Sequence, residues 1–143
     1  MNMYKIGMID DMEGIFTDYV FRMDKENIEL LIALEGMSME SIASWITENE
    51  IQLVLIGTHL TNMFDFTGIK LALYLEENLP DIPVVMMDKY PKEVEDYTSE
   101  EIAKAEANGE NILMENSTEF SDFCTKLKIE IDNANLKQES ENE

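Results

Sequence analysis

The sequence predicts an α/β protein built on a doubly wound parallel sheet. Five short apolar runs alternate with segments in which apolar residues recur every three or four positions. The runs are almost continuous in Ile, Leu, Val and Met, which is typical of parallel strands covered on both faces. Strict alternation of such strands with helices favours right-handed crossovers and one sheet with helices on both sides.

The elements follow from the chain in order. The predicted strands cover residues 4–9, 28–34, 52–56, 83–87 and 111–114. The predicted helices cover residues 12–23, 39–46, 67–78, 98–108 and 120–134. Ser38 is the expected N-cap of the second helix, Asp65 that of the third, and Asn116 with Glu119 can cap the last.

The chain of 143 residues, 45% of them hydrophobic, is long enough for one core. We expect a single domain over residues 1–135 and a disordered acidic tail over residues 136–143. No run approaches the roughly 20 apolar residues of a membrane span, so a soluble, cytoplasmic protein is expected. The one cysteine, Cys124, lies at helical spacing among apolar residues and is predicted to be a buried thiol.

Charge is the strongest signal in the composition. There are 31 Asp and Glu residues against 10 Lys and Arg, which gives a net charge of -21. A field of this sign repels nucleic-acid phosphates and anionic membranes, so we expect direct binding to neither. The expected partner is a protein with a basic surface.

Acidic residues follow several predicted strands. Because the carboxyl ends of parallel strands meet at one edge, Asp10, Asp11, Asp88 and Glu115 are expected to converge there. The absence of a Cys and His cluster argues against zinc. Oxygen ligands of this kind suit Mg²⁺ or Ca²⁺.

Four motifs, in this order and spacing, carry a family resemblance. They are the pair Asp10-Asp11, the run 53–63 with Asp65 and Gly68 after it, the run 79–87 and the run 109–116. Together they resemble the receiver domain of bacterial two-component response regulators, over about residues 3–135. The resemblance implies a flavodoxin-like (βα)5 fold with strand order 2-1-3-4-5, and a Mg²⁺-holding role for the acidic pair.

The residues that carry the family's chemistry are replaced. Gly57 stands where the resemblance places the phosphorylated aspartate, so no side chain is present there to attack a phosphodonor. Asp88 stands at the position of the switch hydroxyl, Glu115 at that of the conserved lysine, and Ile112 at that of the aromatic switch residue. Two added carboxylates would oppose the binding of any anion. These differences predict a degenerate receiver, or pseudo-receiver.

Two interpretations of the acidic edge stay open. In one, Asp10, Asp11, Glu115 and the backbone carbonyl of His59 bind Mg²⁺ or Ca²⁺ weakly. In the other, the carboxylates are solvated, repel one another and hold no cofactor. Isothermal titration with each cation separates the two interpretations.

The segment 93–119 is the candidate partner-binding face, since the family uses this part of the fold for contacts. It carries nine acids and a single base, Lys104. Besides Glu115, the acids are Glu93, Glu95, Asp96, Glu100, Glu101, Glu106, Glu110 and Glu119. The alternative is a merely solvated charged surface.

The leading hypothesis is a stand-alone pseudo-receiver, a regulatory module of signal transduction that binds proteins without being phosphorylated. One alternative is a regulator with a divalent-cation or pH switch in the acidic edge. Another is an acidic decoy that blocks a nucleic-acid-binding partner. No catalytic arrangement is recognised, so an enzyme is not expected, whereas a homodimer is compatible with the sequence.

Overall fold

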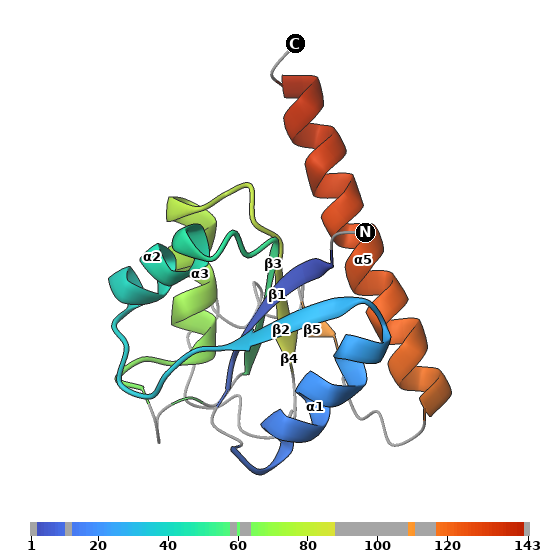
Figure 1. Ribbon diagram of the computed structural model, residues 1–143. Coiled ribbons are helices and arrows are strands. Elements are labelled where there is room, and N and C mark those ends of the chain that lie inside the picture. Colours follow the sequence, from blue (N-terminus) through green and yellow to red (C-terminus); the bar gives the residue numbers. More distant parts are fainter. Residues whose placement is uncertain are drawn as a thin grey trace.

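The computed structural model describes residues 3–10, 13–57, 60, 64–87, 109–110 and 117–141. Its strands are β1 (Tyr4–Ile9), β2 (Ile28–Ile32), β3 (Leu53–Gly57), β4 (Val84–Met87) and β5 (Gly109–Glu110). Its helices are α1 (Glu13–Lys25), α2 (Met39–Glu48), α3 (Gly68–Asn78) and α5 (Ser117–Glu141). Figure 1 shows the sheet between two pairs of helices.

The sheet is parallel, with β1 and β3 at its centre. The order β2-β1-β3-β4 is the predicted one, and the two residues of β5 pair with the end of β4. Ile9 of β1 lies opposite Ile56 of β3 in the ladder. This register brings the residues that follow β1 and those that end β3 to the same edge of the sheet.

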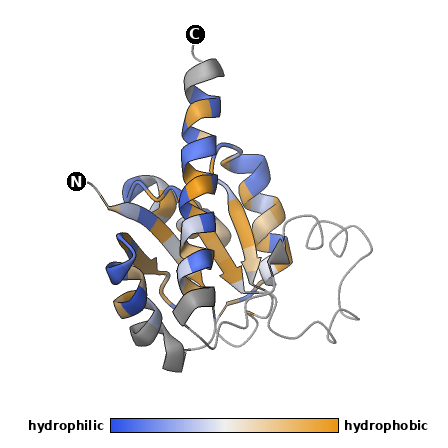
Figure 2. Ribbon diagram, turned by 90° about the vertical axis from the view of Figure 1, so that its right-hand side faces the viewer, coloured by the Kyte–Doolittle hydropathy of each residue, from blue (hydrophilic) through white to orange (hydrophobic). Residues whose placement is uncertain are grey.

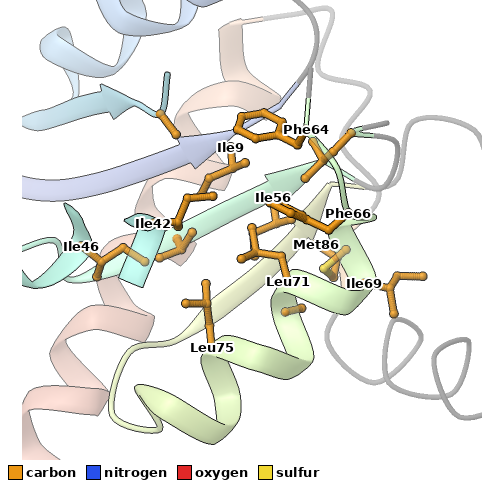
Figure 3. Close-up of a cluster of buried hydrophobic side chains, with 14 of the residues drawn as sticks. Ile9, Ile42, Ile46, Ile56, Phe64, Phe66, Ile69, Leu71, Leu75 and Met86 are labelled. Carbon is orange, nitrogen blue, oxygen red and sulfur yellow. The ribbon is translucent and has the colours of Figure 1, made fainter. Parts of the chain in front are cut away.

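Each face of the sheet has its own core. Leu53 and Leu55 pack on the side of α1 and α5, whereas Val54 and Ile56 pack on the side of α2 and α3. The second of these clusters is drawn in Figure 3, where Ile42, Ile46, Leu71 and Leu75 reach from the two helices toward the strands. Burial on both faces is the physical reason why the strands read as continuous apolar runs.

The strands agree with the predicted ones except at their ends. The predicted second strand extends to Leu34, but β2 ends at Ile32, and the side chain of Leu34 is 75% exposed. Hydrophobicity alone does not distinguish this exposed leucine from its buried neighbours. The predicted strand 111–114 and the predicted helix 98–108 lie outside the described residues.

The caps explain where two helices begin. The side-chain oxygen of Ser38 accepts a hydrogen bond from the backbone N–H of Ser41, as predicted for the start of α2. At α3 the cap is Thr67, whose Oγ1 accepts from the backbone N–H of Lys70. The prediction that Asp65 caps this helix is therefore wrong, because the threonine next to the first helical residue fills that role.

Helix α5 is longer than expected. The residues from 136 onward were predicted to be a disordered tail, but the helix continues to Glu141. Lys, Gln and Glu are good helix formers and no Gly or Pro interrupts them, so the helix can propagate beyond the sheet. The Gln138 side-chain amide also donates to the backbone carbonyl of Asp81, at 3.4 Å.

Further contacts hold α5 against its neighbours. The Tyr4 hydroxyl donates to the carboxylate of Asp132, at 3.0 and 3.2 Å, and Lys128 Nζ donates to the carbonyl of Glu26. The guanidinium of Arg22 lies 4.0 Å from the centre of the Phe120 ring. Helix α5 is thus tied to β1, to α1 and to the turn between α1 and β2.

The Tyr4 contact gives a stability prediction with a defined pH dependence. The hydrogen bond to Asp132, desolvation and the nearby carboxylate charge raise the pKa of Tyr4. A raised folded-state pKa means that the contribution is complete below the unfolded value of about 10 and is lost as pH rises through the folded value. Tyr4→Phe should cost below about 1 kcal/mol at pH 7, since solvent screens the contact. In urea titrations at neutral and alkaline pH, the difference between the two proteins should shrink at high pH; a constant difference would contradict the assignment.

Among the helices of the described residues, none combines the length and the apolar character needed to cross a membrane.

Candidate functional site

The site lies at the carboxyl edge of the two central strands. Asp10 directly follows β1, and Gly57 is the last residue of β3. Since β1 and β3 are paired in parallel with Ile9 opposite Ile56, Asp10 and Gly57 are neighbours across the ladder. The pairing of β1 and β3 therefore places these two positions side by side at one edge of the sheet.

The carboxylate of Asp10 fills the space beside Gly57. A Cβ atom built on Gly57 would lie 2.8 Å from Cγ of Asp10 and 2.9 and 3.0 Å from its two oxygens. Asp10 is only 2% exposed and is the buried charged residue of the described part of the chain. A side chain at position 57 would therefore need Asp10 to move.

A second glycine, Gly68, packs closely against the backbone of Gly57. Gly68 is the first residue of α3, and a Cβ atom built on it would lie 1.9 Å from the carbonyl oxygen of Gly57. The start of α3 thus approaches the β3 backbone more closely than any residue with a side chain allows. In the sequence, Gly68 was recognised only as part of a motif. Its place at the first position of a helix was the signal that could have indicated a close approach of α3 to the β3 backbone.

Aromatic residues cover the same edge after β3. Leu60, Phe64 and Phe66 are buried, and the rings of the two phenylalanines lie 5.4 Å apart. The backbone N–H of Phe64 donates to the carbonyl of Leu60, at 2.8 Å. Asp65, between the two rings in sequence, is exposed. The described residues between β3 and α3 therefore bury apolar side chains at this edge, whereas the carboxylate of Asp65 lies in solvent.

Most of the other predicted site residues lie outside the described part of the chain. These are Asp11, His59, Asp88, Ile112, Glu115 and, on the candidate partner face, Glu93, Glu95, Asp96, Glu100, Glu101 and Glu106. The backbone of Glu110 belongs to β5 and that of Glu119 to α5, but their side chains are not described. The convergence of the four acids and the acidic partner face stay predictions.

The resemblance to receiver domains implies a Mg²⁺ site at this edge of the sheet. Within the described ranges, no group of three or more His, Cys, Asp or Glu side chains is placed to hold a metal ion. Asp10 is the one predicted ligand that is described, and its carboxylate lies against the Gly57 backbone. The described residues alone therefore do not make a cation site.

The lone thiol takes no part in this site. Cys124 is buried in the core between the sheet and α5, as predicted. Burial, followed by the nearby charge of Glu26, raises the pKa of the thiol to about 12. The thiol is therefore protonated at neutral pH and is a packing residue rather than a nucleophile.

No protein-family profile matches this chain, and none of the curated proteins matches it either. Solved structures do match, and they define the class of fold: the chain has the fold of response-regulator receiver domains. This agrees with the fold expected from the motifs.

Three solved structures illustrate the likeness. A receiver domain from Methanospirillum hungatei is 17% identical, with a TM-score of 0.69, covering 94% of this chain and 98% of the other. A receiver domain from Clostridium thermocellum is 18% identical, with a TM-score of 0.64 and coverages of 96% and 98%. The response regulator TrrA of Thermotoga maritima, solved with Mg²⁺ and BeF, is 17% identical, with a TM-score of 0.64 and coverages of 87% and 99%.

Proposed function

We propose that this chain is a signalling module that acts through protein contacts and without phosphorylation at the acceptor position of the receiver fold. One observation carries the proposal: the Asp10 carboxylate lies within 3.0 Å of the place where a Cβ atom of residue 57 would stand. Gly57 has no nucleophile, and its surroundings leave little room for one.

The closeness of Gly68 to the Gly57 carbonyl supports the same proposal. A phosphorylated side chain at the end of β3 needs space for the phosphoryl group and for the loops that respond to it. Here Gly68, the first residue of α3, lies against the carbonyl of Gly57, and Phe64 and Phe66 are buried in the cluster that contains Ile56. The module is therefore proposed to have one resting conformation that no phosphodonor changes, and to catalyse no reaction.

The net charge of -21 supports a partner with a basic surface. Opposite charges on two partners accelerate their encounter, and salt weakens this attraction. The acids of residues 93–119 are the proposed contact region, on sequence grounds. The proposed biological setting is signal transduction of the two-component type.

Titration with beryllofluoride or acetyl phosphate in the presence of Mg²⁺ tests this function. We expect no saturable change in the backbone amide NMR signals of Asp10 and Gly57, because no acceptor carboxylate extends from β3. The Thermotoga TrrA receiver, which was crystallised with Mg²⁺ and BeF, is the positive control. Saturable shifts confined to the residues around Asp10, and absent in Asp10→Asn, would overturn the proposal and identify Asp10 as a phosphoryl-binding group.

A further inference from the structure

Strand β2 forms one edge of the sheet. Among the described strands, the order β2-β1-β3-β4-β5 gives it one neighbour, β1, and the ladder between the two runs from Ile28 to Ile32. Figure 1 shows β2 in front of the other strands, with α1 beside it. An edge strand presents a row of backbone N–H and C=O groups to which another chain can add.

The ladder with β1 shows which backbone groups of β2 point outward. The carbonyl of Asn27 accepts a hydrogen bond from β1 at 3.1 Å, and the N–H of Ala33 donates to β1 at 3.0 Å. Alternate residues of a strand bond to the same neighbour, so the odd-numbered residues of β2 face β1. The N–H and C=O groups of Leu30 and Ile32 therefore point away from the sheet.

The sequence of β2 does not protect this edge. Natural edge strands often carry lysine, proline or a β-bulge, which oppose the addition of another strand. Residues 28–32 include neither lysine nor proline, and their register against β1 is unbroken. Four of these five residues are apolar, as in the inner strands, which Figure 2 shows mainly in the hydrophobic colour. The edge therefore suits the addition of a strand.

The side chains beside this edge are apolar apart from one carboxylate. On the side of α2, Leu31 is half-buried, and its ladder partner Gly7 lies under the ring of Trp45, 3.1 Å from a Cβ atom built there. Glu29 lies on the same side of the sheet as Leu31 and is exposed. Leu34, two residues past the end of β2, is 75% exposed. An added strand would thus meet apolar surface and one negative charge.

From this edge and its surroundings, we propose that β2 is a docking site for an extended segment of a partner protein, which adds to the sheet as a further strand. Successive side chains of an added strand point to opposite sides of the sheet. On the α2 side they meet Glu29, which favours lysine, and the alkyl stem of a lysine can pack on Leu31 and Trp45. On the α1 side they meet Ile32, which favours an apolar residue. The docked segment therefore alternates basic and apolar residues.

The charge of the protein favours such a segment over a second copy of this chain. Each copy has a net charge of -21, so two copies joined along their β2 edges would repel each other. The same field attracts a basic segment, and salt should weaken that attraction. This docking site involves none of residues 93–119 and is independent of phosphorylation at position 57.

Amide hydrogen exchange followed by NMR tests the docking site. The probe is a short synthetic peptide that alternates valine and lysine. At saturating peptide, exchange of the Leu30 and Ile32 amide protons should slow by at least about tenfold, because these groups gain acceptors. The amides of Glu29 and Leu31 face β1 and should change little. Protection of Leu30 and Ile32 that appears without peptide and rises with protein concentration would identify a second copy as the occupant and overturn the proposal.

Two methylated peptides separate strand addition from simple charge attraction. One carries methyl groups on the backbone nitrogens of its valines and the other on those of its lysines, so both keep the charge and the side chains of the parent peptide. Only one of these two sets of nitrogens faces β2 in an added strand. That peptide should bind at least about tenfold more weakly than the parent, since it loses several hydrogen bonds, whereas the other should still bind.

Variants of the protein test the position of the site. Glu29→Lys should weaken binding of the parent peptide by about tenfold, since an attraction between neighbouring strands becomes a repulsion. Glu77→Lys, at an exposed glutamate of α3, changes the net charge equally and is the matched control. Leu34→Ser should weaken binding by about threefold, with Leu136→Ser on α5 as its control. Circular dichroism checks that each variant is folded.

Three results would each overturn the proposal. The first is that the parent peptide does not bind, or binds without slowing exchange at Leu30 and Ile32. The second is that both methylated peptides bind as tightly as the parent. The third is that Glu29→Lys and Glu77→Lys weaken binding equally, which would mean that the peptide responds to the overall charge and not to the edge of β2.

Discussion

Gly68→Ala is expected to destabilise the protein by about 3 kcal/mol, the upper end of what overpacking costs. The added methyl group would lie 1.9 Å from the carbonyl oxygen of Gly57, and backbone cannot rotate aside as a side chain does. Helix α3 would have to shift away from β3, separating Ile69 and Leu71 from the core they fill. Urea unfolding followed by the emission of Trp45 measures the change in the free energy of unfolding.

The direction of the change in the free energy of unfolding distinguishes the close contact from ordinary helix propensity. In an ordinary helix, alanine is more favourable than glycine by roughly 1 kcal/mol. Gly36→Ala is the matched control: its φ is +85°, but nothing lies within 4 Å of the added atom. It should cost about 1 kcal/mol through backbone conformation alone. If Gly68→Ala stabilised the protein, or cost no more than Gly36→Ala, the close contact between α3 and β3 would be contradicted.

Gly57→Asp, which introduces the acid that the resemblance to receiver domains places at this position, is expected to destabilise the protein by about 2 kcal/mol and to give no efficient phosphorylation. The new Cβ atom would lie 2.8 Å from Cγ of Asp10, so the Asp10 side chain must leave its buried place. Two carboxylates would then compete for one partly dry space. Urea unfolding measures the stability, and intact-protein mass spectrometry after acetyl phosphate treatment measures the modification.

A double-mutant cycle separates crowding by Asp10 from a general intolerance of side chains at position 57. If Asp10 is the obstacle, Gly57→Asp should cost at least about 1 kcal/mol less in an Asp10→Ala background than in the wild type. Gly57→Ala, which adds the Cβ atom without a second charge, should fall between wild type and Gly57→Asp. Equal costs of Gly57→Asp in both backgrounds would show that Asp10 is not the obstacle.

The strands and helices could be predicted from the sequence because they depend on local and periodic patterns of residues. Burial on both faces made β1, β3 and β4 readable as apolar runs, and the Ser38 cap and the helical spacing fixed α2. The assignment of Gly57 to the acceptor position rests on the resemblance of its strand to that of receiver domains and stays a prediction. These features need no knowledge of which atoms meet across the chain.

The contacts that the sequence did not predict depend on how elements that are distant in the chain pack against one another. The position of the Asp10 carboxylate over Gly57 follows from the register of β1 and β3, and the contact of Gly68 follows from how closely α3 docks. The extension of α5 was missed for another reason. A charged, polar segment is typical of disorder, yet the same residues continue a helix easily when a packed helix precedes them.

The contact between Asp10 and Gly57 also has an evolutionary consequence. If an aspartate at position 57 and the present placement of Asp10 exclude each other, a lineage cannot regain the acceptor by one substitution without passing through a less stable protein. On the proposed function, a glycine in place of the acceptor gives the Asp10 carboxylate the space that it occupies, and each residue then makes a change at the other less favourable. Only an order of substitutions that relaxes Asp10 first would avoid this penalty, so the two positions are expected to vary together among descendants.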